Sequence, residues 1–105
     1  ITAAVAKARS QLGPLLSVEV EVRNFIELQE ALAAMPDVIM LDNMSLDDMK
    51  KAVELTKGRV PLEASGNVTL DTLAAIAETG VDFISSGAIT HSARAVDMSM
   101  LIEKL

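Results

Sequence analysis

The spacing of hydrophobic and polar residues changes several times along the chain. Four short segments have the length and alternation of buried or half-buried strands: 18–23, 37–43, 59–65 and 81–87. Four others repeat apolar residues three and four positions apart, as amphipathic helices do: 2–12, 24–35, 45–57 and 69–79. Residues 88–105 then predict a loop and a last helix. The pattern is one helix followed by four strand–helix units of roughly 20 residues.

Polar residues that favour helix starts stand where three of these helices are expected to begin. Asn24 and Glu27 have the spacing of a capping box, in which each side chain accepts a backbone N–H. Ser45 and Thr69 precede the next two helices and are expected to cap them in the same way. The local signals therefore agree with the hydrophobic pattern.

A strand–helix repeat of this length is typical of a parallel sheet with helical crossovers. Two α/β architectures fit, namely an open doubly wound sheet and part of a (β/α) barrel. The strands are short and carry polar residues on one side, which favours the barrel. A complete barrel takes about 250 residues, so four strands make about half of one. We expect residues 1–105 to form a partial barrel domain and to be a piece of a longer protein.

Three carboxylates recur at one position of the repeat. Glu21, Asp42 and Glu63 are evenly spaced along the chain, and each lies near the end of a predicted strand. We expect them at matching positions in a barrel mouth, the usual place of the active site. Clustered carboxylates need a cation. Arg23 and Arg94 are candidates, and Mg²⁺ bound together with a phosphate substrate also suits a small number of oxygen ligands. Chance placement at strand ends is the alternative.

Two strand-to-helix corners combine serine with glycine. The candidate phosphate-binding residues at these corners are Ser65, Gly66, Asn67, Ser86, Gly87 and Ala88. Free N–H groups at a helix start, with glycine allowing close approach, favour an anion and most often a phosphate. A plain tight turn that needs glycine is the alternative. His91, the only histidine, follows on the same predicted face, although a lone histidine is more often a surface hydrogen-bonding residue.

Composition narrows the class of protein. The chain has 105 residues, half of them hydrophobic, with no cysteine and a net charge of −6. The acidic balance argues against nucleic acid as a partner, because a basic face would be expected. No apolar run approaches the roughly 18 residues of a membrane span. We therefore expect a cytoplasmic protein that binds neither nucleic acid nor membrane.

Five motifs occur in a fixed order and spacing and together are specific to one family: "VEVEV", "MLDNMS", "LEASGNVTLDTL", "AETGVDFISSGA" and "THSARAVDMS". Together they resemble the C-terminal part of the catalytic barrel domain of the quinolinate phosphoribosyltransferases, the carboxylating nicotinate-nucleotide pyrophosphorylases. The resemblance implies conversion of quinolinate and phosphoribosyl pyrophosphate, with Mg²⁺, to nicotinate mononucleotide, pyrophosphate and CO₂. This is a step of NAD biosynthesis.

The resemblance also implies roles for particular residues. Glu21 and Asp42 match the acids that interact with Mg²⁺ and with the ribose hydroxyls. The two serine–glycine corners match phosphate-binding loops, and His91 matches a position near the active site. Asn67 stands where many members have a second glycine. No family role carries over to Glu63.

The family builds its site in a homodimer or a higher homo-oligomer, with an N-terminal domain and first barrel strands that this chain is expected to lack. The quinolinate-binding basic residues are expected there, and the isolated chain is expected to be inactive. Two other hypotheses stay open. The chain is part of another sugar-phosphate barrel enzyme, or it is a half-barrel that folds without catalysis.

Overall fold

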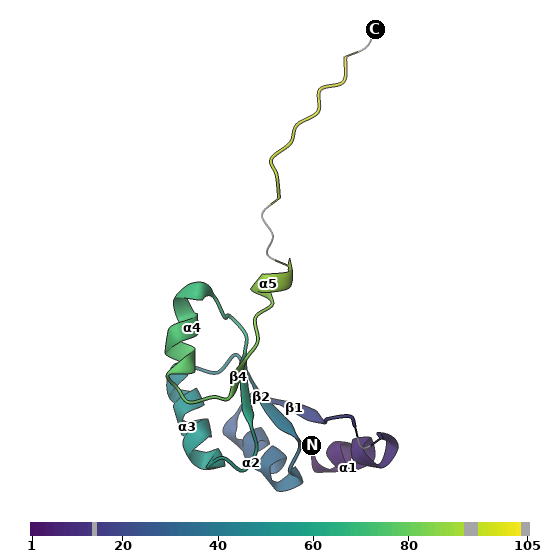
Figure 1. Cartoon of the computed structure of the whole chain (residues 1–105), viewed down its shortest axis with the longest axis vertical. Coiled ribbons are helices and arrows are strands. Elements are labelled where there is room, and N and C mark those ends of the chain that lie inside the picture. The colour runs from purple at the N-terminus through teal and green to yellow at the C-terminus, as the bar shows by residue number, and fades with distance from the viewer. Residues whose placement is uncertain (14, 92–94, 104–105) are drawn as a thin grey trace.

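The computed structural model describes residues 1–13, 15–91 and 95–103. Helices and strands alternate from the first turn onward (Figure 1). Their bounds are α1 (Thr2–Gln11), β1 (Glu19–Val22), α2 (Phe25–Ala34), β2 (Val38–Asp42), α3 (Leu46–Thr56), β3 (Leu62–Ser65), α4 (Leu70–Ala77), β4 (Phe83–Ile84) and α5 (Ala88–His91). The α/β class, the four strands and the first three strand–helix units predicted from the sequence are confirmed.

The four strands form one parallel sheet in the order β1-β2-β3-β4. Each strand therefore lies beside the one that precedes it in the chain. A doubly wound sheet reverses its strand order at a switch point, and no such reversal occurs among these strands. The sequential order is that of a (β/α) barrel.

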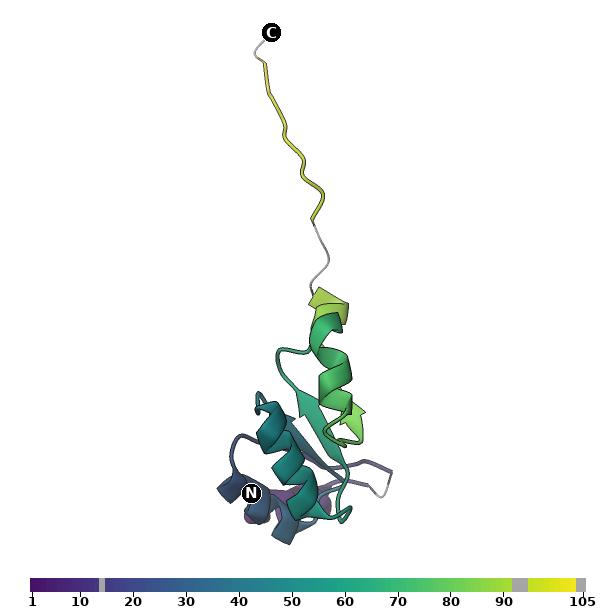
Figure 2. The same cartoon turned by 90° about the vertical axis from the view of Figure 1, so that its left-hand side faces the viewer.

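One face of the sheet packs against helices α2, α3 and α4, and Figure 2 shows α3 and α4 side by side in front of the strands. Burial alternates along β2 and β3, as the pleat requires. The side chains on this face and on the helices that cover it make a single aliphatic core. Its most deeply buried large members are Val22, Leu28, Ile39, Leu41, Val60 and Leu62.

The opposite face of the sheet is polar. Glu21, Met40, Asp42 and Glu63 alternate with the core residues on β1 to β3, and no helix in the described part of the chain covers them. An all-parallel sheet is normally covered on both faces or closed into a barrel. An acidic inner face fits the barrel, because its mouth holds charged groups rather than core.

All three predicted helix caps form. The side chains of Asn24 and Ser45 accept hydrogen bonds from the backbone N–H groups of Glu27 and Asp48, and Thr69 forms a capping box with Thr72. The capping box predicted for Asn24 is only half correct. The Glu27 carboxylate accepts the N–H of Arg23, at 2.7 Å, instead of that of Asn24.

The last helix predicted within 88–105 is wrong for the residues that the structure describes. Only α5 forms there, as a single turn, and 95–103 contains neither helix nor strand. Five apolar side chains of this segment are each at least 77% exposed: Val96, Met98, Met100, Leu101 and Ile102. A short helix without a packed apolar face is unstable in water.

Candidate functional site

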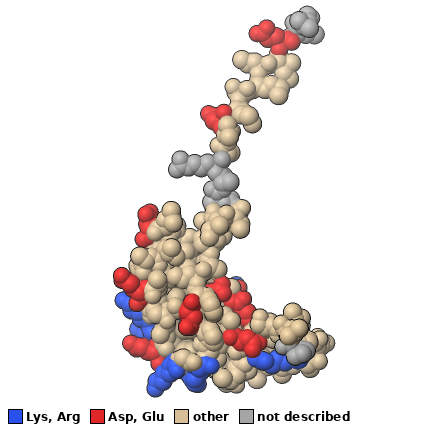
Figure 3. Space-filling view, viewed as in Figure 1, with Lys and Arg blue, Asp and Glu red and all other residues tan. Residues whose placement is uncertain are grey.

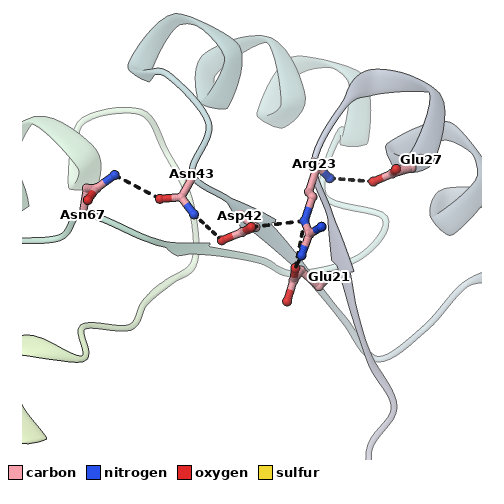
Figure 4. Close-up of polar contacts among 6 residues, drawn as sticks. All are labelled: Glu21, Arg23, Glu27, Asp42, Asn43 and Asn67. Carbon is pink, nitrogen blue, oxygen red and sulfur yellow. Dashed lines mark hydrogen bonds and ion pairs between the residues drawn. The ribbon is translucent and has the colours of Figure 1, made fainter. Parts of the chain in front are cut away.

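The predicted acids lie on the open face at the carboxyl ends of β1 and β2. Arg23 follows β1 and pairs with both (Figure 4). Its guanidinium lies 2.7 Å from Glu21 Oε1, through Nη2, and 3.3 Å from Asp42 Oδ2, through Nε. The Glu21 hydrogen bond raises the pKa of Arg23, and the charge of Asp42 raises it further. Arg23 is therefore the counter-charge that the sequence called for, while Arg94 lies outside the described residues.

The three acids do not occupy matching positions, which corrects the prediction from their equal spacing. Glu21 is level with Met40, and Met40 is level with Glu63. Asp42 is level with Ser65, so it stands one side-chain pair nearer the mouth. Equal spacing along the chain does not require equal height, because the register between strands is set by the packing of the core face.

Glu19 and Glu63 form a second acidic pair, deeper in the sheet. Burial raises the pKa of Glu19, and the neighbouring Glu63 carboxylate raises it further. A carboxyl with a raised folded-state pKa contributes fully to the stability of the folded state below its ordinary value of 4.5, and this contribution is lost as the pH rises through the raised value.

Replacing Glu19 with glutamine is therefore expected to raise the urea midpoint of unfolding near pH 7. The effect should disappear below pH 4.5, where the Glu19 carboxyl of the unchanged protein is protonated in both the folded and the unfolded state. Glu54→Gln, on an exposed face of α3, is the matched control and should change neither midpoint. A midpoint for Glu19→Gln equal to or below that of the unchanged protein near pH 7 would contradict the assigned repulsion.

The corner after β3 has the geometry of an anion site. Gly66 and Asn67 both have left-handed backbone, with φ of 93° and 53°. Within the described ranges, the N–H groups of Gly66, Asn67 and Val68 donate to no other backbone group. Successive free N–H groups beside the first turn of α4 form a concave donor surface that suits a phosphate or another anion.

The corner after β4 joins the first in one pocket. Ser86 Oγ donates to the carbonyl oxygen of Val68 at 2.9 Å, which ties the two loops together. The pocket between them has a volume of about 380 Å³. Its lining residues are Ser65, Gly66, Asn67, Val68, Thr69, Ser85, Ser86, Gly87 and Ala88. All six corner residues predicted from the sequence therefore meet at one cavity. His91 ends α5, just after this lining.

Asn43 belongs to the motif "MLDNMS", but the sequence alone predicted no role for it. It follows the last residue of β2 and reaches both halves of the site. Its amide donates to Asp42 Oδ1 at 2.7 Å and accepts from the side chain of Asn67 at 3.0 Å. One feature of the sequence could have pointed to it. An asparagine directly follows the aspartate that ends the strand, and asparagine adopts left-handed backbone more readily than most residues.

A magnesium ion fits these residues in one way. No group of three or more metal-binding side chains lies close together in the described part of the chain, so a dedicated cage is not built there. Mg²⁺ is commonly bound by one or two carboxylates together with substrate phosphates. Glu21 and Asp42 supply two carboxylates at the same mouth as the anion pocket, which suits a metal ion that arrives with a phosphate substrate.

Charge on this side of the molecule is unevenly distributed. Figure 3 shows acidic side chains gathered over the strands at the middle of the molecule and basic side chains along the lower edge. The acidic middle corresponds to the polar face of the sheet. Such a face attracts cations and repels free anions.

Sequential parallel strands with an acidic mouth define a partial barrel of the α/β class. The family model described as quinolinate phosphoribosyl transferase, C-terminal domain, matches residues 1–101. The chain belongs to this family.

Relatives and solved structures agree. The chain is 51% identical to a probable carboxylating nicotinate-nucleotide pyrophosphorylase of Synechocystis sp., over 97% of the chain and 36% of the relative. It is 43% identical to a Bacillus subtilis protein of the same name, over 95% of the chain and 35% of the relative. The nicotinate-nucleotide pyrophosphorylase structure from Francisella tularensis matches with a TM-score of 0.83 and 50% identity, over 94% of the chain and 35% of that structure.

The chain therefore spans about a third of the length of the relatives that it matches. Its similarity to the Francisella tularensis structure agrees with the partial barrel predicted from the strand pattern. Among the described residues, no helix has both the length and the apolar character needed to cross a membrane.

Proposed function

We propose that this chain forms one wall of the active site of a quinolinate phosphoribosyltransferase. The ring nitrogen of quinolinate attacks the anomeric carbon of phosphoribosyl pyrophosphate, and pyrophosphate leaves. The carboxylate beside the ring nitrogen is then lost as CO₂, and the ring carbon that carried it takes up a proton from solvent, which leaves nicotinate mononucleotide for NAD synthesis. The observation that carries the proposal is that both serine–glycine corners line one pocket beside the paired acids, in a chain of this family.

The pocket is proposed to hold a phosphate group of the substrate. Gly66 and Asn67 present backbone N–H groups, and Ser65 adds a hydroxyl group at the same cavity, while Ser86 holds the two loops together through its bond to Val68. Phosphoryl oxygens accept hydrogen bonds from such donors, which fixes the ribose relative to the mouth. Gly87 and Ala88 complete the proposed phosphate cradle, and His91 lies at its edge.

Glu21 and Asp42 are proposed to act at the ribose and to hold Mg²⁺, directly or through water. Positive charge develops at the anomeric carbon as pyrophosphate leaves. Fixed carboxylates at the mouth stabilise that charge more than they stabilise the neutral sugar, which lowers the barrier. When bound, Mg²⁺ neutralises charge on the pyrophosphate. Neither role requires a nucleophilic side chain.

Oligomeric state and location follow from the same proposal. We propose that the full-length gene product is a homodimer or a higher homo-oligomer that works in the cytoplasm, with quinolinate and phosphoribosyl pyrophosphate as its small-molecule partners. The acidic composition, with a net charge of −6, supports the absence of a nucleic-acid partner.

The test is turnover by the full-length gene product. With quinolinate, phosphoribosyl pyrophosphate and Mg²⁺ supplied, we expect nicotinate mononucleotide, pyrophosphate and CO₂ in equal amounts, and removal of Mg²⁺ with a chelator should abolish turnover. Nicotinate in place of quinolinate is the control, because it lacks the carboxylate beside the ring nitrogen and can release no CO₂ on transfer. A folded protein that forms no product would contradict the proposal and would favour another sugar-phosphate substrate or a non-catalytic role.

A further inference from the structure

Asn43 is held firmly by the backbone of the sheet. It has left-handed backbone, with a φ of 52°, directly after the end of β2. Its N–H donates to the carbonyl oxygen of Ser65 at 2.9 Å, which extends the pairing of β2 with β3 by one residue. The turn therefore aims the Asn43 side chain along the mouth of the sheet, between the two strand ends.

The side chain of Asn43 bridges the two halves of the site (Figure 4). Its Nδ2 donates to Asp42 Oδ1 at 2.7 Å, and its Oδ1 accepts from Asn67 Nδ2 at 3.0 Å. Asp42 is paired in turn with Arg23, and Arg23 with Glu21. A continuous set of polar contacts thus runs from the phosphate corner to both acids.

Gly66 shows how closely the corner packs on this amide. A Cβ atom built on Gly66 would lie 2.2 Å from Asn43 Oδ1 and 2.5 Å from Asn43 Cγ. Contacts under 3.0 Å are essentially never seen for real Cβ atoms, so any larger residue at 66 would have to displace the Asn43 side chain or shift the corner. The backbone of the anion pocket therefore rests directly against the side chain that holds Asp42.

We propose that Asn43 is a positioning residue that locks the phosphate corner and the Asp42 carboxylate into one mutual geometry. A phosphate bound at Gly66 and Asn67 and a cation held at Asp42 then meet at a fixed separation. The inference rests on the proposed function for the identity of the substrate. It goes beyond that function because it assigns a role to a residue that does not itself line the phosphate pocket.

The decisive variant is Asn43→Gly, because glycine adopts left-handed backbone without strain and removes only the side-chain bridge. Exposed hydrogen bonds of this kind contribute modestly to folding, so the melting temperature should change little. Loss of a group that orients a site residue typically lowers activity by about 10- to 100-fold. We expect a loss of that size in kcat/KM for phosphoribosyl pyrophosphate. Most of it should appear in kcat, because the variant loses the orientation of Asp42 but keeps the hydrogen-bond donors of the pocket.

Lys57→Gly is the matched control. Lys57 has a φ of 51°, almost the same as that of Asn43, but it caps the far end of α3, away from the strand mouth. It should leave kcat and KM unchanged. Asn67→Gly provides a second arm, because it cuts the bridge only at the corner. If Asn43 acts through the bridge, adding Asn43→Gly to the Asn67→Gly variant should lower kcat/KM by less than about a further twofold.

Calorimetry with inorganic pyrophosphate separates this inference from the proposed function. Mg²⁺ should tighten pyrophosphate binding by the unchanged protein, and Asn43→Gly should reduce that tightening by about 10-fold or more. This measurement remains decisive even where quinolinate is not turned over. Equal Mg²⁺ dependence in both proteins, fully multiplicative losses for Asn43→Gly and Asn67→Gly, or no Mg²⁺-dependent pyrophosphate binding would each overturn the inference.

Discussion

Asp42→Ala is expected to lower kcat/KM for phosphoribosyl pyrophosphate by about 10²- to 10³-fold, the usual loss when a preorganised electrostatic group is removed from a site. Asp42 holds the central position among the polar contacts at the mouth. One oxygen accepts from Asn43, and the other pairs with Arg23. Without it, Arg23 stays paired with Glu21 alone, and the mouth loses a proposed Mg²⁺ ligand.

Stability should change little in the same variant. The Asp42 side chain is 24% exposed and that of Arg23 is 70% exposed. Ion pairs in such settings contribute about 0–1 kcal/mol to the free energy of unfolding. The Mg²⁺ concentration needed for half-maximal activity should rise together with the loss of kcat/KM.

The control for Asp42→Ala is Asp47→Ala, at an exposed position in the first turn of α3. It removes the same charge from the same part of the chain and should leave the kinetics unchanged. Steady-state rates over a range of Mg²⁺ concentrations, with thermal unfolding in parallel, provide the measurement. Wild-type kinetics in Asp42→Ala would remove this residue from the site.

Gly66→Ala is expected to be the most damaging change to the phosphate corner. The new methyl group would overlap the Asn43 amide. Overpacking of this kind costs about 1–3 kcal/mol. The left-handed backbone, with φ of 93°, adds strain for any residue that carries a Cβ atom. Relief of the overlap must move either the corner or Asn43, so phosphate affinity and stability should fall together.

Substitutions at two other glycines separate the two causes of the loss in Gly66→Ala, which are overlap with Asn43 and backbone strain. Gly58 has a φ of 67° with no atom within 4 Å of an added Cβ, so Gly58→Ala should show the backbone strain alone. Gly13 has an equally open surrounding and no left-handed φ, so Gly13→Ala should be neutral. Urea unfolding and calorimetric binding of inorganic pyrophosphate test all three. A loss in Gly66→Ala no greater than that in Gly58→Ala would show that contact with Asn43 is unimportant.

Local sequence patterns determined the elements and the chemistry at their ends. The strict alternation of 18–23 predicted β1, and the caps at Ser45 and Thr69 formed as expected. Serine and glycine at the ends of β3 and β4 identified the lining of a single pocket. These features depend on neighbours a few residues away, so one sequence is enough to predict them.

The same local reasoning failed where position depended on distant contacts. The apolar residues of 95–103 predicted a helix, but no helix forms there, because nothing in the described chain covers these side chains. The equal spacing of Glu21, Asp42 and Glu63 suggested equal height, but strand register placed Asp42 level with Ser65. Register follows from which side chains fill the core between sheet and helices, and spacing along the chain does not contain that information.

The sequence by itself determined the repeat, the acids and the two corners, because hydrophobic period and turn chemistry are local properties. Only the tertiary structure decided how these parts meet. Arg23 joins Glu21 to Asp42 across two strands, and Asn43 joins Asp42 to Asn67, which lies far along the chain. Such contacts exist because a parallel sheet brings successive strand ends to one edge, where side chains distant in sequence lie within hydrogen-bonding distance.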